Sequence, residues 1–267
     1  MSQHDSFNEA SGTEEPYPAA SLGQAAAGFV PTTRSLAQKV AIACRVLAEA
    51  GHNAGFGLAS QVTAKDGEGA FWTQTYGLAL EEATAANQMR VDMDLQCLTG
   101  TGMVNPANRF HAWIYRARAD VRAIAHTHAQ HVAALAMTGL PLHVAHMDTV
   151  ALYGRVAHLP QWPGVPFGDD EGRIISQALG QHKAVLLAHH GLVTVGASIE
   201  EACNLAMVFE HAAQLQLLAL SSGQALPNLP PALGEAARRF AEVPLYALAH
   251  FEYYARRVGN ASRGETV

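Results

Sequence analysis

Two short stretches of this sequence are the most informative about its structure: AIAHTHAQH at residues 123–131 and LLAHHGLVTVG at residues 186–196. Each contains a run of small and branched apolar residues typical of a buried strand, and each places histidines at the end of such a run. Residues i and i+2 of an extended chain point to the same side, so His126 and His128 can converge on one ion. In the second stretch, the glycine after the histidine pair permits a sharp turn. Two strand ends that both present histidines therefore predict a site built from three imidazoles.

The donor set indicates which metals such a site would hold. Neutral imidazole suits zinc, iron, nickel or copper, and three protein ligands with an open position are typical of a catalytic site rather than a structural one. An HxH pair or an HHG turn alone is a weak pattern, whereas both in one chain carry more weight. The sequence contains no HExxH, CxxC, GxSxG or P-loop motif. We assign five further histidines to the surface or to loops, without a metal role: His4, His52, His158, His182 and His250.

Strand and helix patterns alternate along the chain, which predicts an α/β class with a central sheet. Strands are expected over residues 60–64, 70–75, 88–92, 95–98, 121–126, 184–188 and 192–195, the first two forming a hairpin around Asp66 and Gly67. Helices are expected over residues 36–47, 105–117, 130–137, 170–179, 198–221 and 232–258, with Asn105 and Ser198 as N-caps. We expect a single domain over residues 31–259, a flexible N-terminal tail over 1–30 and a C-terminal tail over 260–267.

The composition excludes several classes of protein. Of the 267 residues, 49% are hydrophobic and 15% are charged, which is a globular composition rather than a disordered one. The net charge is −6 and Lys and Arg form no run, so we expect no nucleic-acid partner. No apolar stretch reaches membrane length and the start of the chain lacks a signal-peptide pattern, so we expect no membrane partner. Three widely spaced cysteines, Cys44, Cys97 and Cys203, indicate reduced thiols in a cytoplasmic protein.

Residues 105–201 resemble the class II aldolase/adducin family. The matching phrases are VNPANRFHAWIYRARADVRAIAHTHAQH, ALYGRVAH and AVLLAHHGLVTVGASIEEA. The resemblance implies that His126, His128 and His190 bind one divalent metal ion per subunit, with zinc as the first choice and iron, manganese or cobalt as alternatives. His189 then becomes a neighbour of the site. It also implies a three-layer α/β/α sandwich with a mainly antiparallel central sheet, and a homo-oligomer, commonly a tetramer, with active sites at subunit interfaces.

The chain departs from the sugar-phosphate aldolases of this family at positions that carry their chemistry. Ala107 stands where those aldolases have a glutamate that acts as acid and base, and a methyl group cannot transfer a proton. Their Gly-Asn-x-Ser phosphate loop is replaced by Gly57-Leu58-Ala59-Ser60, so we do not expect a phosphorylated sugar as substrate. Their catalytic tyrosine falls near His146, and the pair His146-Met147 looks like the decarboxylase branch of the family.

These features predict a divalent-metal-dependent C–C lyase, a decarboxylase of a hydroxylated aromatic or related hydroxy or oxo carboxylic acid. His146 is the expected proton donor, because an imidazole titrates near neutral pH, and His111 and Tyr153 are further candidates for the catalytic pocket. Three alternatives stay open: a non-haem Fe(II) oxygenase that oxidatively decarboxylates a hydroxyphenyl acid, an aldolase acting on a non-phosphorylated substrate, and a non-catalytic adducin-like interaction domain.

Overall fold

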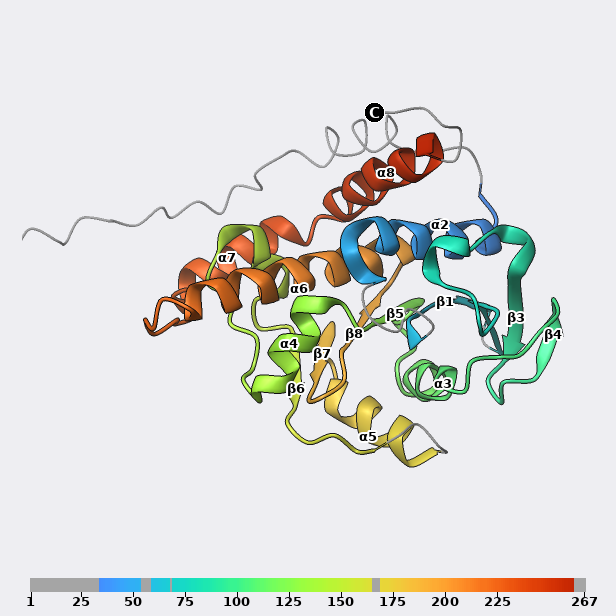
Figure 1. The fold of residues 1–267 in the computed structure, drawn as a ribbon, viewed down its shortest axis with the longest axis horizontal. Helices are drawn as coiled ribbons and strands as arrows, with labels where there is room; N and C mark the ends of the chain where they lie inside the picture. Colours follow the sequence, from blue (N-terminus) through green and yellow to red (C-terminus); the bar gives the residue numbers. More distant parts are fainter. Residues whose placement is uncertain (1–33, 54–58, 68, 165–168, 262–267) are drawn as a thin grey trace, which may run out of the picture.

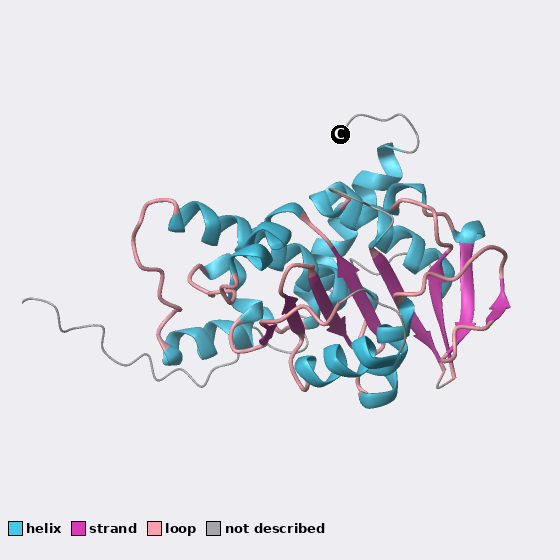
Figure 2. Cartoon of the chain, turned by 60° about the horizontal axis from the view of Figure 1, so that its bottom comes forward, coloured by secondary structure: helices cyan, strands magenta, loops and turns pink. Residues whose placement is uncertain are grey.

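One eight-stranded sheet forms the centre of the computed structural model, which describes residues 34–53, 59–67, 69–164 and 169–261 (Figures 1 and 2). The strands are β1 (Gln61–Asp66), β2 (Ala70–Gln74), β3 (Gln88–Asp92), β4 (Cys97–Thr99), β5 (Ala123–Thr127), β6 (Val156–Leu159), β7 (Ala184–Leu187) and β8 (Leu192–Gly196). They lie in the order β4-β3-β2-β1-β5-β8-β7-β6. Neighbouring strands are antiparallel except β6 and β7, which are parallel. The prediction of a mainly antiparallel sheet is confirmed.

Helices cover both faces of this sheet, so the expected three-layer α/β/α sandwich is also confirmed (Figure 2). One layer contains α2 (Leu36–Leu47), α4 (Gln130–Thr138) and α6 (Ile199–Leu220), with α8 (Pro244–Ala261) packed outside α2 and α6. The opposite layer contains α3 (Asn108–Ala117) and α5 (Asp169–Leu179). Helix α7 (Pro231–Ala241), which precedes α8 in the chain, packs against the 3-10 turn Met147–Leu152.

Alternation along β5 divides its side chains between the two apolar cores. Ala123 and Ala125 belong to the core under α2, α4 and α6, whereas Ile124 belongs to the core under α3 and α5. His126 follows with the same orientation as Ile124, because residues two apart on a strand share a face. The strand pattern therefore delivers His126 to the α3 side of the sheet, at the end of a central strand.

Two helix boundaries differ from the sequence-based expectation. The helix expected from Asn105 begins at Asn108, because the Asn105 side chain accepts a hydrogen bond from the Ala107 N–H at 3.0 Å and forms a turn before the helix. The helix expected over residues 232–258 is two helices, with Pro244 beginning the second. Proline lacks the N–H that a continuous helix would need there.

The ends of the chain are described only in part. The tail expected over residues 1–30 lies outside the described residues, as do residues 262–267 of the expected C-terminal tail, whereas α8 continues through Ala261. Among the helices in the described ranges, none combines the length and apolar character needed to cross a membrane.

Candidate metal centre

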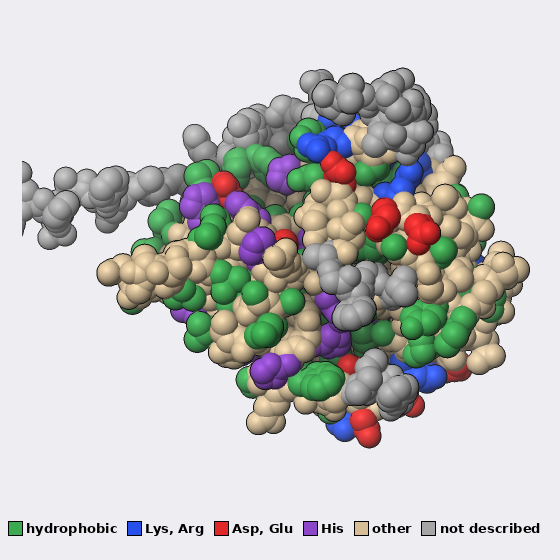
Figure 3. Space-filling view, viewed as in Figure 1, with side chains coloured by type: hydrophobic (Ala, Val, Ile, Leu, Met, Phe, Trp, Pro, Cys, Tyr) green, Lys and Arg blue, Asp and Glu red, His purple; other side chains and the backbone are tan. Residues whose placement is uncertain are grey.

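The three predicted ligands meet where the central strands end. His126 is in β5, His128 follows two residues later, and His190 lies in the turn between β7 and β8. Because β8 pairs with β5 and sets His126 opposite Val193, this turn lies beside the end of β5. The candidate ligand atoms of the three histidines all lie within 4.8 Å of one another, and the Nε2 atoms of His126 and His128 are 3.0 Å apart. Figure 3 shows histidine side chains spread from the upper left of the displayed face to its centre.

Hydrogen bonding and burial leave these imidazoles in the form that binds metals. The Nδ1–H of His126 donates to the Leu192 carbonyl at 2.8 Å, so the Nε2 atom of the neutral ring keeps a free lone pair. Burial, and secondarily His128, His190 and His111, hold the pKa of His126 well below its usual value. Burial followed by His128 lowers the pKa of His190 to about 4. At neutral pH these rings are therefore unprotonated, as ligation requires.

The donor geometry fits a first-row divalent ion. Zinc–nitrogen bonds of about 2.0–2.1 Å in a tetrahedral site place ligand nitrogens about 3.3 Å apart, close to the 3.0 Å between His126 and His128. The Nδ1 atom of His190 is buried and has no hydrogen-bond partner in the described part of the chain. No carboxylate joins the cluster among the described residues. Three imidazoles with remaining positions open suit zinc or ferrous iron.

Gly191 lets the β7–β8 turn approach the first two histidines. A Cβ atom at this position would lie 2.5 Å from the Thr127 carbonyl oxygen and 2.9 Å from Cδ2 of His128. The preceding His189 has a left-handed φ of 56° and an exposed side chain, and its N–H donates to the Ala136 carbonyl at 3.1 Å. Glycine is thus required for contact between the two parts of the site rather than for a turn alone.

His111 lies in the interior beside this cluster. Its side chain is fully buried, and its Nδ1 atom is 2.9 Å from the Thr63 hydroxyl, which is 2.8 Å from the Tyr115 hydroxyl. Burial lowers the pKa of His111 to about 3. The Phe110 ring contacts the rings of both His111 and His126, with centroid separations of 4.5 and 5.0 Å.

The other two predicted pocket residues have different partners in the described part of the chain. His146 is half exposed, accepts a hydrogen bond from the Asp148 N–H at 3.3 Å, and lines a cavity of about 210 Å³ beside α6. The Tyr153 hydroxyl donates to the Leu229 carbonyl at 3.1 Å, and its ring covers Gly234. Their hydrogen bonds in the described ranges do not reach the three histidines. Their catalytic roles stay predictions.

The prediction that His52 lies on the surface or in a loop is wrong. Its side chain is fully buried, its Nδ1 atom is 2.8 Å from the Thr127 hydroxyl, and Thr127 separates His126 from His128. No local pattern could have found this contact, since His52 ends a π-helical turn that only the fold brings against β5.

Glu210 secures the segment after His128. Its carboxylate accepts hydrogen bonds from the backbone N–H groups of His131 and Val132 at 3.0 and 2.9 Å, and lies 2.6 Å from Nδ1 of His131. These are first-turn donors of α4, which have no partner inside their own helix. A residue of α6 therefore caps the helix that begins two residues after a candidate ligand.

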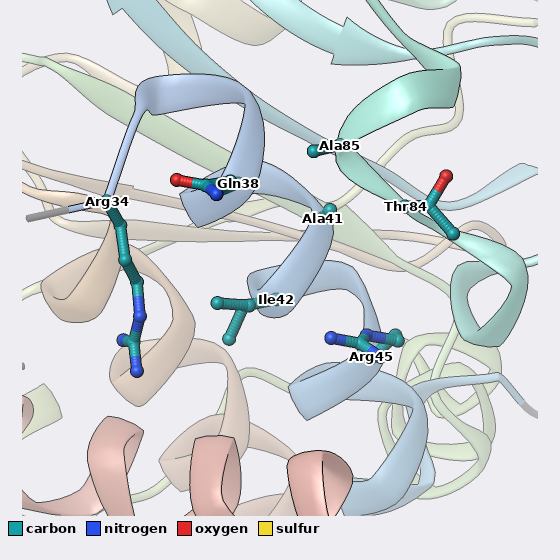
Figure 4. A pocket seen from close by; sticks show the side chains of 7 residues that line it. All are labelled: Arg34, Gln38, Ala41, Ile42, Arg45, Thr84 and Ala85. Carbon is teal, nitrogen blue, oxygen red and sulfur yellow. The ribbon is translucent and has the colours of Figure 1, made fainter. Parts of the chain in front are cut away.

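A separate hollow of about 380 Å³ lies beside α2 (Figure 4). It is lined by Arg34, Gln38, Ala41, Ile42, Arg45, Thr84 and Ala85. Arg34 is already engaged there, since its guanidinium pairs with Glu252 at 2.6 Å. Ala59 and Ser60 of the aldolase phosphate-loop position are not among the residues that line this hollow, and Gly57 and Leu58 of that position are outside the described residues.

Comparison with known proteins agrees with the fold. Residues 38–217 match the family described as Class II Aldolase and Adducin N-terminal domain. The match covers more than half of the chain and includes all three histidines. The chain belongs to the class II aldolase/adducin family.

The proteins similar to this chain are named for different activities. The chain is 33% identical over 175 residues to the 4-hydroxy-3-prenylphenylpyruvate oxygenase/4-hydroxy-3-prenylbenzoate synthase of Streptomyces roseochromogenus subsp. oscitans, covering 64% of this chain and 63% of that protein. It is 33% identical over 172 residues to Decarboxylase NovR of Streptomyces niveus, covering 63% and 64%. The matches thus span just under two thirds of these relatives. Among solved structures, L-fuculose 1-phosphate aldolase from Glaciozyma antarctica PI12 superposes with a TM-score of 0.78 at 28% identity, covering 91% of this chain and 98% of that one.

Proposed function

We propose that this protein is a divalent-metal-dependent lyase that decarboxylates a hydroxylated aromatic or related hydroxy or oxo carboxylic acid. The observation that carries the proposal is the cluster of His126, His128 and His190, three neutral imidazoles with no carboxylate among them in the described residues. Membership of a family of lyases supports C–C bond cleavage. The similarity to a protein named as a decarboxylase supports this branch of the chemistry.

Different residues of this chain have different proposed roles in the reaction. His126, His128 and His190 would hold the ion, zinc being the expected one, and a bound divalent ion stabilises negative charge on the substrate as the C–C bond breaks. The electron pair of that bond stays on the substrate fragment, CO2 leaves, and the fragment takes up one proton. Ala107, at the N-cap of α3, offers no acid or base. This suits decarboxylation, which deprotonates no substrate hydroxyl, better than aldol cleavage. His146 is the proposed donor of the proton.

A second candidate is a non-haem Fe(II) oxygenase. The relative named as an oxygenase has the same 33% identity as the relative named as a decarboxylase. Three histidines can also hold ferrous iron with positions left for substrate and oxygen.

Metal analysis combined with product assays separates these functions. Purified protein is analysed for metals, then incubated with hydroxybenzoates, hydroxyphenyl acids and sugar acids, with and without oxygen, while CO2 release and oxygen uptake are recorded. We expect CO2 release without oxygen uptake. Oxygen uptake matching CO2 release would replace the lyase with the oxygenase, and aldehyde formation from sugar acids would replace it with the aldolase. Protein that neither contains nor takes up metal would indicate an interaction domain.

The ligand assignment has its own control. His126→Ala should lose both bound metal and turnover, whereas His211→Gln, at an exposed position of α6, should keep both. Full metal content in His126→Ala would refute the assignment.

A further inference from the structure

Three buried polar side chains form a chain of hydrogen bonds on the α3 side of the sheet. Thr63 of β1 lies between His111 and Tyr115 of α3, with its hydroxyl 2.9 Å from the His111 Nδ1 atom and 2.8 Å from the Tyr115 oxygen. All three side chains are at most 2% exposed. His111 and Tyr115 are four residues apart and so lie on one face of the helix. Because the three side chains are buried, they supply one another's donors and acceptors in these two hydrogen bonds.

Counting donors and acceptors gives these bonds a direction. Burial keeps the His111 ring neutral, so only one of its two nitrogens carries a proton. If Tyr115 donates to Thr63 and Thr63 donates to Nδ1, the one polar hydrogen left over is on Nε2 of His111. In the reverse direction, both the Tyr115 hydrogen and the Nε2 lone pair have no partner in the described part of the chain. An unsatisfied buried group costs free energy, so the first arrangement, with its single unsatisfied atom, is the favoured one.

The unpartnered Nε2 atom belongs to a ring beside the metal cluster. The β1–β5 register sets Gln61 opposite His126, and Thr63 lies two residues farther along the same face of β1. The Phe110 ring touches both His111 and His126. His111 is also close enough to His126 to contribute to its electrostatic environment.

We propose that Tyr115 and Thr63 are positioning residues that hold His111 as the Nε2–H tautomer, and that this N–H donates to an anionic oxygen of the substrate at the metal cluster. A neutral imidazole that donates a hydrogen bond stabilises developing negative charge without transferring its proton. The substrate group it selects is a phenolate or carboxylate oxygen rather than an amine. The substrate part of this inference rests on the proposed function, whereas the tautomer does not.

The tautomer is tested by nitrogen NMR without any substrate. Protein labelled with ¹⁵N-histidine shows whether Nδ1 or Nε2 carries the proton, and the His111 signals are those absent from His111→Asn. The protonated nitrogen should be Nε2 in the wild type and in Thr63→Ser. It should become a mixture of both nitrogens in Tyr115→Phe, and the preference should be lost in Thr63→Val. A wild-type spectrum with the proton on Nδ1 would overturn the proposal whatever reaction the protein performs.

The donor role is tested by a matched pair of substitutions. An asparagine oxygen can accept the Thr63 hydrogen bond but leaves no N–H at the Nε2 position, whereas a glutamine amide can place one there. With the acid that the product assays show to be turned over, His111→Asn should lose roughly 10- to 100-fold in kcat/KM, the effect of one hydrogen bond to a charged group. His111→Gln should recover at least part of that loss, and both should keep their metal.

Each outcome of this comparison decides the donor role. Wild-type kcat/KM in His111→Asn, or equal losses in both variants with metal retained, would overturn it. If no acid is turned over, binding of 4-hydroxybenzoate by the metal-loaded protein is the readout, and equal affinity for wild type and His111→Asn would overturn it in the same way. Failure of the decarboxylase proposal is therefore distinguishable from failure of this one.

Discussion

Gly191 is the single residue that lets the two parts of the candidate metal cluster approach each other. Gly191→Ala would put a methyl group 2.5 Å from the Thr127 carbonyl oxygen and 2.9 Å from the His128 ring, so the β7–β8 turn must move away. We expect the metal dissociation constant to rise at least tenfold, because displacing one of three ligands costs more than about 1.4 kcal/mol. Equilibrium dialysis against a zinc chelator measures this. Gly259→Ala, where a new Cβ meets nothing within 4 Å, is the control; equal affinities in the two variants would contradict the prediction.

His52 makes the stability of the metal-free protein depend on pH. Burial lowers the pKa of His52 from 6.5 to about 4 in the folded state. Between these values the unfolded chain binds a proton that the folded chain does not, so stability falls as the pH falls from about 6.5 to about 4. The contribution is roughly 1.4 kcal/mol per pH unit. Urea unfolding at pH 7, 6 and 5 should show a shallower dependence in His52→Gln than in wild type. His211→Gln should match wild type, and identical slopes in all three would refute the assignment.

Glu210 joins two helices, since it belongs to α6 and accepts hydrogen bonds from α4. Its carboxylate caps α4, which begins two residues after His128. Glu210→Gln removes the charge that favours the helix N-terminus, and we expect a loss of about 1 kcal/mol in the free energy of unfolding, together with weaker zinc binding. Glu200→Gln, on the same helix and paired with Lys39 at 3.0 Å, should lower stability without changing zinc affinity. Chemical denaturation and zinc titration test both variants. Unaltered zinc binding in Glu210→Gln would show that the α4 cap does not influence the metal site.

Local patterns predict the helices and strands of this fold better than the contacts between them. Ser198 caps α6 as expected, accepting from the Glu201 N–H at 3.1 Å, and the histidines lie at strand ends as their spacing indicates. The contacts of His52 with Thr127 and of Glu210 with His131 join residues 75 and 79 positions apart. No periodicity encodes such a pairing. These pairings follow from the order of the strands in the sheet, which cannot be read from local patterns in one sequence.

The resemblance to a family supplied what spacing alone left open. The HxH and HHG patterns predict three imidazoles but do not choose between His189 and His190. The fold supplies the physical reason: His189 is exposed with a left-handed φ of 56°, while His190 faces the other two rings at centroid separations of 5.0 and 4.7 Å. The same burial that selects His190 keeps it neutral.

For the whole molecule, the surroundings of His146 lead to a prediction about assembly, because the cavity that it lines includes none of the three candidate ligands among its lining residues. The resemblance implies a homo-oligomer with active sites between subunits, so we expect His146 to act in a neighbour's site. His126→Ala and His146→Ala should each be inactive alone. When the two variants are denatured, mixed equally and refolded together, the mixture should regain about a quarter of wild-type activity. A site is active only when one subunit supplies an intact His126 and its neighbour supplies an intact His146, and each condition is met in about half of the cases. The measurement is CO2 release from the refolded mixture, with sedimentation reporting its oligomeric state. A site completed within one chain would leave the mixture as inactive as its parts, since no subunit carries both intact histidines.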